Sequence, residues 1–186
     1  MRHNTRVFVS IICLALCMAG CKKDKDTPVH AVGETYQGGI VAYILQPGDA
    51  GYDANKQHGI IAAASDQNSG ALIAWGSAGL VGVTGTGIGL GKGNTSKIVA
   101  LYASSNYAAN VCNNLTLNGY DDWYLPSEEE LHKLFTVKAS INISNDRYWS
   151  STEADAQTAV TIRFMDGVVI NQTKTITNKV RAVRSF

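Results

Sequence analysis

The chain has 186 residues, 45% of them hydrophobic, and a formal net charge of +1 at pH 7. Phosphate binding needs clustered Lys and Arg, so this charge and the lack of a basic run in the folded part argue against a nucleic-acid partner. The few histidines and cysteines exclude a zinc cluster. A chain of this length and apolar content can form one domain with a sizeable core.

Residues 1–20 have the pattern of a bacterial lipoprotein signal peptide. A positive start that includes Arg2 and Arg6 precedes an apolar run, residues 7–16, that is too short to cross a bilayer as a helix. Small residues then stand before Cys21, as the lipoprotein signal peptidase requires. We therefore expect cleavage before Cys21 and attachment of lipid, such as palmitate, to this residue.

Residues 21–32 are expected to form a lipidated tether, since the charged residues 22–26 cannot belong to a core. Lys22 stands where an aspartate would retain many lipoproteins in the inner membrane. The sequence therefore favours the outer membrane or the cell surface, with the periplasmic leaflet as the alternative, and makes the membrane a partner through the lipid. Residues 33–186 are expected to form a single domain, in which Cys112 is a lone thiol without a disulfide.

Strands are predicted in the first part of this domain. Residues 35–45, 58–64 and 71–75 are rich in β-branched, aromatic or other apolar residues, and the first range ends at a turn that begins with Pro47-Gly48. Glycine recurs at almost every second or third position between residues 79 and 93, which predicts a long, packed loop. Its spacing does not fit a phosphate-binding loop, so no nucleotide cofactor is expected.

The first of two expected helices follows the glycine-rich stretch. Asn94 or Thr95 is its predicted N-cap, and apolar residues recur at three-four spacing along one face as far as Leu115. Cys112 lies on this face. We therefore expect Cys112 to be buried and unreactive.

The second expected helix begins after Pro126. Ser127 and Glu130 have the spacing of a capping box, and Leu131, Leu134 and Phe135 provide a buried stripe.

The remaining segments are strand-like, in residues 147–152, 159–165, 168–170 and 180–186. Asp166-Gly167 between two of these segments predicts a two-residue hairpin turn. Residues 171–178 are expected to form a polar loop.

Several of these segments together resemble the DUF1566 family, which is common in lipoproteins of the Bacteroidetes. The segments are Gly38-Gly39-Ile40-Val41, His58-Gly59-Ile60-Ile61-Ala62-Ala63, Gly87-Ile88-Gly89, and residues 118–131, 148–153 and 180–184. The resemblance implies an α+β fold of the C-type lectin-like kind, similar also to the sulfatase-modifying-factor domain. Two helices would pack on irregular, mostly antiparallel sheets, with the N- and C-terminal strands paired.

The resemblance implies a fold more firmly than a function, because the family has no established biochemical activity. The signature residues are read as determinants of the fold. They are Trp123, Leu125, Pro126, Ser127, Glu130, Trp149 and Arg181.

No catalytic residue is predicted, because no nucleophile lies in a motif with a base and an orienting group. We therefore expect a non-catalytic, lipid-anchored recognition or structural module whose partner is a surface glycan or protein. The alternative is a cell-envelope enzyme that acts on polysaccharide or protein. A further alternative is a receptor with diversified ligand-binding residues near its last strands.

The candidate ligand-binding residues are Trp75, Tyr120, Asp121 and Asp122, because exposed aromatic rings beside carboxylates suit sugar recognition. In the alternative interpretation, the last three residues fix the turn into the second helix.

No metal or other cofactor is assigned, and calcium is the one ion kept open. Carboxylates and amides in loops are the ligands that calcium prefers. Such residues are Asp121, Asp122, Asn145, Asp146, Glu153 and Asp155. The calcium-site signatures of sugar-binding lectins do not occur in the chain.

Overall fold

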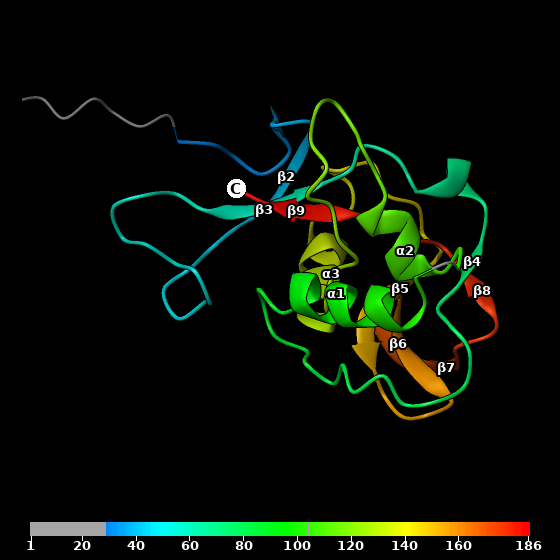
Figure 1. The fold of residues 1–186 in the computed structure, drawn as a ribbon. Helices are drawn as coiled ribbons and strands as arrows, with labels where there is room; N and C mark the ends of the chain where they lie inside the picture. The colour runs from blue at the N-terminus through cyan, green and yellow to red at the C-terminus, as the bar shows by residue number, and fades with distance from the viewer. Residues whose placement is uncertain (1–28, 104) are drawn as a thin grey trace, which may run out of the picture.

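The computed structural model describes residues 29–103 and 105–186, so the predicted signal peptide and Cys21 lie outside the described residues. The described part is an α+β fold with three α-helices, a short 3-10 helix (Asn68–Gly70) and nine strands in three sheets (Figure 1). This confirms the predicted fold class. Within these residues, none of the helices is both long enough and apolar enough to cross a membrane.

The four-stranded sheet contains the first and the last strand of the described chain. Its order is β1 (Thr35–Tyr36), β2 (Gly39–Ile44), β3 (Gly59–Ala62) and β9 (Val183–Ser185), with every pair antiparallel. The resemblance implied that the terminal strands pair with each other. They share a sheet but are not paired directly, because β2 and β3 lie between β1 and β9. All four residues of β3 are buried, as expected of a central strand covered on both faces.

The predicted strand 35–45 is interrupted by a tight turn at Gln37 and Gly38. Both residues have positive φ angles, 40° and 88°. A Cβ atom at Gly38 would lie 2.7 Å from the Tyr120 ring, so glycine is required both by the turn and by this close approach.

The other two sheets contain the late strands. One consists of β5 (Arg147–Glu153), β6 (Thr158–Arg163) and β7 (Val168–Thr173), and the other pairs β4 (Ile73–Ala74) with β8 (Thr177–Asn178). The prediction of a polar loop over residues 171–178 is therefore wrong, since residues 171–173 belong to β7 and residues 177–178 form β8. Arg163 pairs with Val168, so the hairpin has a four-residue connection, residues 164–167, instead of the predicted two-residue turn. Phe164, in this connection, has a buried side chain, and its N–H donates to the Asp146 carbonyl (2.8 Å).

The first predicted helix is two helices, α1 (Gly91–Leu101) and α2 (Ala108–Asn113), which brings the number of α-helices in the described residues to three. It begins before the predicted cap, and Asn94 and Thr95 lie inside α1. The Asn94 amide donates to the Gly85 carbonyl (2.8 Å), and the Thr95 hydroxyl donates to the Leu125 carbonyl (3.2 Å). These tertiary hydrogen bonds replace the expected capping role.

The break between α1 and α2 lets the chain fold back on itself. The Asn110 side chain donates to the carbonyl of Tyr102, the C-cap residue of α1, at 2.9 Å. Ser105 and Asn106, in the connection, are weak helix formers because their side chains compete for backbone groups. Cys112 on α2 is fully buried, as predicted, and this burial raises the pKa of its thiol.

The last helix, α3 (Glu128–Thr136), begins where the sequence predicted. Ser127 is its N-cap and accepts a hydrogen bond from the Glu130 N–H (3.4 Å), while the Glu130 carboxylate accepts from the Ser127 N–H (2.8 Å). The predicted capping box is confirmed.

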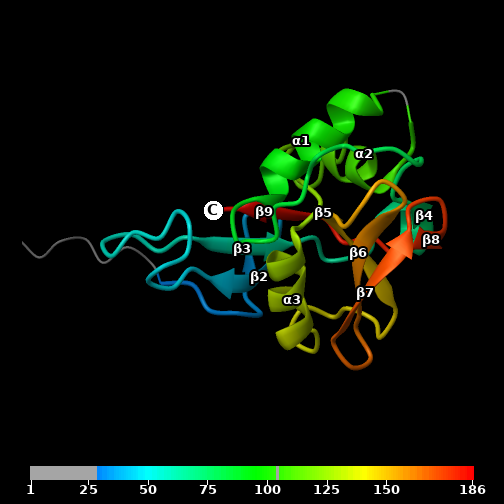
Figure 2. The same ribbon diagram turned by 90° about the horizontal axis from the view of Figure 1, so that it is seen from below.

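The four-stranded sheet separates the core into two clusters. Val41 and Ile61 point to one face, where they join residues of α1 and α2, and Ala42 and Ile60 point to the other, where they join α3. This follows from the alternation of side chains along a strand. Figure 2 shows the same arrangement, with α1 and α2 on one side of the sheet and α3 on the other.

Candidate functional site

Trp75 is unable to contact a ligand, contrary to the sequence interpretation. Its side chain is 0% exposed, and the indole N–H donates to the Ser150 carbonyl at 2.8 Å. Trp75 directly follows β4 and lies two positions after the buried Ile73, so the alternation of the strand, continued by one residue, turns the ring into the core. Trp123 and Trp149 are buried as well.

Tyr120 and Asp122 are held by Arg184 of β9. The Arg184 guanidinium pairs with the Asp122 carboxylate at 2.6 and 3.1 Å and lies 4.1 Å from the centroid of the Tyr120 ring. Burial raises the pKa of Asp122, but the hydrogen bonds and charge of Arg184 outweigh this effect and hold the pKa below its ordinary value. These contacts support the structural interpretation of Tyr120 and Asp122, while Asp121 is exposed.

The oxygens considered for calcium serve other purposes. Glu153 is buried in an ion pair with Lys174 (2.5 Å), Asp155 accepts two N–H groups of its own turn, and Asp146 accepts from Ser144. Across residues 29–103 and 105–186, no three His, Cys, Asp or Glu side chains are grouped so that they could hold a metal ion.

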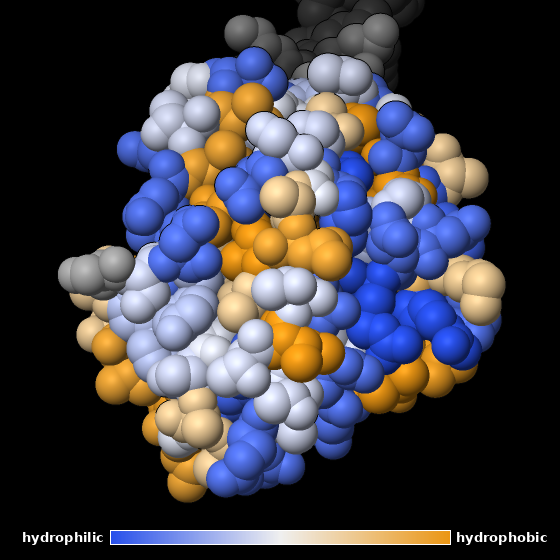
Figure 3. Space-filling model, turned by 90° about the vertical axis from the view of Figure 1, so that its right-hand side faces the viewer, coloured by the Kyte–Doolittle hydropathy of each residue, from blue (hydrophilic) through white to orange (hydrophobic). Residues whose placement is uncertain are grey.

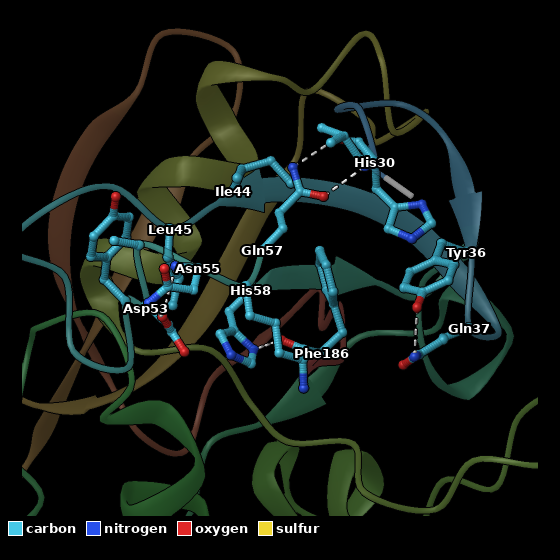
Figure 4. Close-up of a pocket in the computed structure, with 14 residues that line it drawn as sticks. His30, Tyr36, Gln37, Ile44, Leu45, Asp53, Asn55, Gln57, His58 and Phe186 are labelled. Carbon is cyan, nitrogen blue, oxygen red and sulfur yellow. Dashed lines mark hydrogen bonds between the residues drawn. The ribbon is translucent and has the colours of Figure 1, made fainter. Parts of the chain in front are cut away.

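A pocket of about 470 Å³ opens between the N-terminal segment, the β2–β3 connection and Phe186 (Figure 4). Five aromatic rings line it, those of His30, Tyr36, Tyr52, His58 and Phe186. His30 stacks on Tyr36 with ring centroids 3.6 Å apart, and Phe186 meets both rings edge-on at 6.0 and 5.3 Å. We call this cavity the aromatic pocket.

Gln57 fixes one wall of the aromatic pocket. Its side-chain carbonyl accepts from the His30 N–H (2.6 Å), and its amide donates to the His30 carbonyl (3.0 Å). His30 falls within the predicted tether 21–32, so the last residues of that tether belong to the folded domain. The reason is that the Gln57 amide satisfies both backbone groups of His30, as a neighbouring strand would.

A further pocket of about 300 Å³ adjoins the aromatic pocket. Leu45, His58 and Phe186 line both cavities, and Glu130 and Ser185 line only this second pocket. The His58 Nδ1–H donates to the backbone oxygen of Phe186 at 2.9 Å, which fixes the ring between the two cavities (Figure 4). We call the smaller cavity the Glu130 pocket.

Glu130 is a buried carboxylate at the wall of this pocket. Burial raises its pKa, and the donors on the carboxylate oppose this rise only in part. The donors are the N–H of Ser127 (2.8 Å), the N–H of Gly89 (2.8 Å) and the Tyr124 hydroxyl (3.3 Å). Burial also raises the pKa of Tyr124, whose hydroxyl lies 3.1 Å from that of Ser185.

The surface on the side of the molecule away from the aromatic pocket carries scattered apolar residues. Figure 3 shows this side, where apolar side chains form patches interrupted by polar ones. Single exposed residues such as Leu72 (53% exposed) and Ile176 (41% exposed) are normal for a soluble surface. The two adjoining pockets are therefore the candidate site.

Sequence reasoning missed the pocket residues. Tyr52, Asn55, Gln57 and His58 stand close together in the β2–β3 connection, and a loop that combines aromatic rings with amides is a signal that could have pointed to them. His30 and Phe186 carry no such signal, since they reach the pocket only through the fold.

The fold and the adjoining pockets define an α+β domain with a ring- and amide-lined cleft at one end of its main sheet. Residues 67–184 match the family described as the Lcl C-terminal domain. This match covers more than half of the chain, and the protein belongs to that family. No curated protein matches the chain. All residues that line the aromatic pocket lie outside residues 67–184.

Proposed function

We propose that this protein is a non-catalytic binding module, held at the bacterial outer membrane or cell surface by lipid on Cys21. The aromatic pocket carries the proposal, because about 470 Å³ lined by rings and amides suits a small ligand or part of a larger one. A surface glycan or protein is the expected partner. The C-type lectin-like and Bacteroidetes-type relationship is part of this proposal, and the α+β arrangement is consistent with it.

A cell-envelope enzyme is the second candidate, and Glu130 is the observation that favours it. A buried carboxyl with a raised pKa at a pocket wall is typical of a general acid. However, three donors already bind this carboxylate, two of them backbone N–H groups, and one of these completes the cap of α3. We therefore assign Glu130 to the fold and favour the binding module.

The proposal is tested by screening the mature protein, purified in detergent, on glycan and peptide arrays. Tyr52→Ala and Asn55→Ala remove groups that line the aromatic pocket, and each is expected to weaken binding about tenfold, a change of about 1.4 kcal/mol. Thr173→Ala on exposed β7 is the matched control and should bind like the parent.

Two outcomes would overturn the proposal. Turnover of an arrayed compound that is lost in Glu130→Gln would identify an enzyme. Equal binding by the parent and both pocket variants would place the ligand elsewhere on the domain.

A further inference from the structure

We propose that the aromatic pocket and the Glu130 pocket together form one cleft for an uncharged oligosaccharide of at least two sugar units. The inference rests on the proposed function and names its class of ligand. The chain would cross the ridge formed by Leu45, His58 and Phe186, the three residues that line both cavities.

The shared lining is the first argument. The volumes are about 470 Å³ and about 300 Å³, and pockets for small ligands cover roughly 300–1,000 Å³, so each cavity alone is in the lower half of this range. The three shared side chains are only partly buried, so a ligand that fills one cavity can continue over them into the other. The cleft therefore suits a chain of linked units better than a single ring.

The chemistry of the ridge is the second argument. The Phe186 ring and the Leu45 side chain offer apolar surface, which matches the C–H faces of a sugar ring. The His58 ring is fixed through its Nδ1–H, which donates to the Phe186 oxygen at 2.9 Å. In the neutral ring the other nitrogen, Nε2, is then an acceptor, which suits a sugar hydroxyl.

The balance of charge is the third argument. Lys56 and Asp53 are the exposed charged residues of the aromatic-pocket lining, and their opposite charges cancel. His30 is bonded to Glu34 at 2.9 Å, and Glu130 is buried under its own donors. No arginine is present among the described residues that line either cavity. Sulfate, phosphate and carboxylate groups favour clustered Arg and Lys, so the lining selects an uncharged chain.

The position of the aromatic pocket along the chain distinguishes it from the part of the chain that matches the family. The aromatic pocket is built wholly from residues outside the matched range 67–184. Residues 52–58 between β2 and β3, together with His30 and Phe186, therefore add the aromatic pocket to a domain whose helices lie within that range.

The test measures how affinity depends on chain length. Isothermal titration of the mature protein in detergent would use β-1,4-linked glucose, xylose and N-acetylglucosamine chains of one to six units. For at least one series, affinity is expected to rise about tenfold from the monosaccharide to the disaccharide or trisaccharide and then to level off. A heparin-derived tetrasaccharide and a soluble peptide library serve as the anionic and peptide comparisons.

Two variants separate the parts of the cleft. Ala50→Trp places a large side chain at the Glu130 pocket from an exposed position, and should abolish the gain with chain length while keeping monosaccharide affinity. Asn55→Ala, in the aromatic pocket, should weaken chains of every length. Thr173→Ala should behave as the parent.

Each other outcome counts against the inference. Affinity independent of chain length, unchanged chain-length dependence in Ala50→Trp, or binding of none of the neutral chains would overturn it. If the heparin tetrasaccharide or a peptide binds instead, and Asn55→Ala weakens that binding, the proposed function stands and only the ligand class is wrong. If nothing binds in an Asn55-dependent way, both proposals fail.

Discussion

Glu153 and Lys174 are both fully buried, and their charged atoms lie 2.5 Å apart. Burying two charges is unfavourable unless the pair and its remaining hydrogen bonds compensate. The Glu153 carboxylate accepts from the N–H groups of Val81 (2.8 Å) and Gly82 (2.7 Å), and the Lys174 ammonium donates to the Gly79 carbonyl (2.7 Å). The pair therefore attaches the glycine-rich loop to β5 and to the turn after β7.

Breaking this pair should be strongly destabilising. Lys174→Met removes the positive charge and leaves Glu153 buried without its partner, which should lower the free energy of unfolding by about 3–5 kcal/mol. Urea denaturation measures the change. The double variant Lys174→Met/Glu153→Gln should be less destabilised than the single one, and equal losses in both would contradict the argument.

The raised pKa of Glu130 predicts how the free energy of unfolding depends on pH. Its pKa is raised in the folded protein, mainly by burial, so folding favours the protonated form. The stability that this protonation provides is complete below the unfolded-state pKa and is lost as pH rises through the higher folded-state pKa. The free energy of unfolding of the parent should therefore fall relative to that of Glu130→Gln as pH rises above the ordinary carboxyl pKa of 4.5.

The comparison requires urea denaturation of both proteins at each pH. Glu130→Gln should be less stable in absolute terms by about 1–3 kcal/mol, because an amide N–H₂ cannot accept the hydrogen bond from the Ser127 N–H. A constant difference across the pH range would show that Glu130 is not shifted.

At the scale of elements, α1 and α3 begin for different reasons. The start of α3 is local, since Ser127 and Glu130 satisfy each other's backbone N–H groups. The start of α1 is fixed by tertiary packing. Gly91 lies so close to the cap of α3 that a Cβ atom on it would overlap the Glu130 carboxylate. A glycine is unfavourable in a helix by about 1 kcal/mol relative to alanine, and here the close approach of the first residue of α1 to the cap of α3 requires it.

The cap of α3 gives a prediction for a single hydroxyl. Ser127→Ala removes the acceptor for the Glu130 N–H and the donor to the Gly87 carbonyl, and should lower the free energy of unfolding by about 1 kcal/mol. Chemical denaturation with the Ser96→Ala control measures it. Ser96 is exposed and bonds only within α1, so its loss should stay within about 0.5 kcal/mol. Equal effects of the two substitutions would remove the capping argument.

At the scale of the whole molecule, the N-terminal segment that would carry the lipid also builds the candidate site. Val29 and His30 line the aromatic pocket, and the Gln57 side chain binds the His30 backbone. A ligand in this pocket would therefore lie near the point where the domain joins its anchor.

The anchor itself is tested with Cys21→Ala. Acyl transfer needs a thiol on this residue, so the variant is expected to lose lipid and to remain uncleaved or become soluble. Detergent phase partitioning and mass spectrometry of the N-terminal peptide measure both effects. A variant that partitions into the detergent phase in its cleaved form, like the parent, would contradict the lipoprotein assignment.

The sequence alone determined the α+β class, the cap of α3, the hairpin of β6 and β7 and the burial of Cys112. These features depend on residues close together in the chain, through capping bonds, alternation in strands and three-four spacing in helices. The same information predicted one helix across residues 94–115, because the pattern of apolar residues does not contain the hydrogen bond from Asn110 to Tyr102.

Tertiary structure decided the burial of Trp75 and the location of the candidate site. By sequence, Trp75 is a ligand-binding candidate because, unlike Trp123 and Trp149, it belongs to none of the family signatures. The pairing of β4 with β8 and the bond to Ser150 place it in the core. The aromatic pocket joins His30, Gln57 and Phe186. Their contacts bridge long stretches of chain, and the pairing of β3 with β2 and β9, which no local pattern specifies, brings them together.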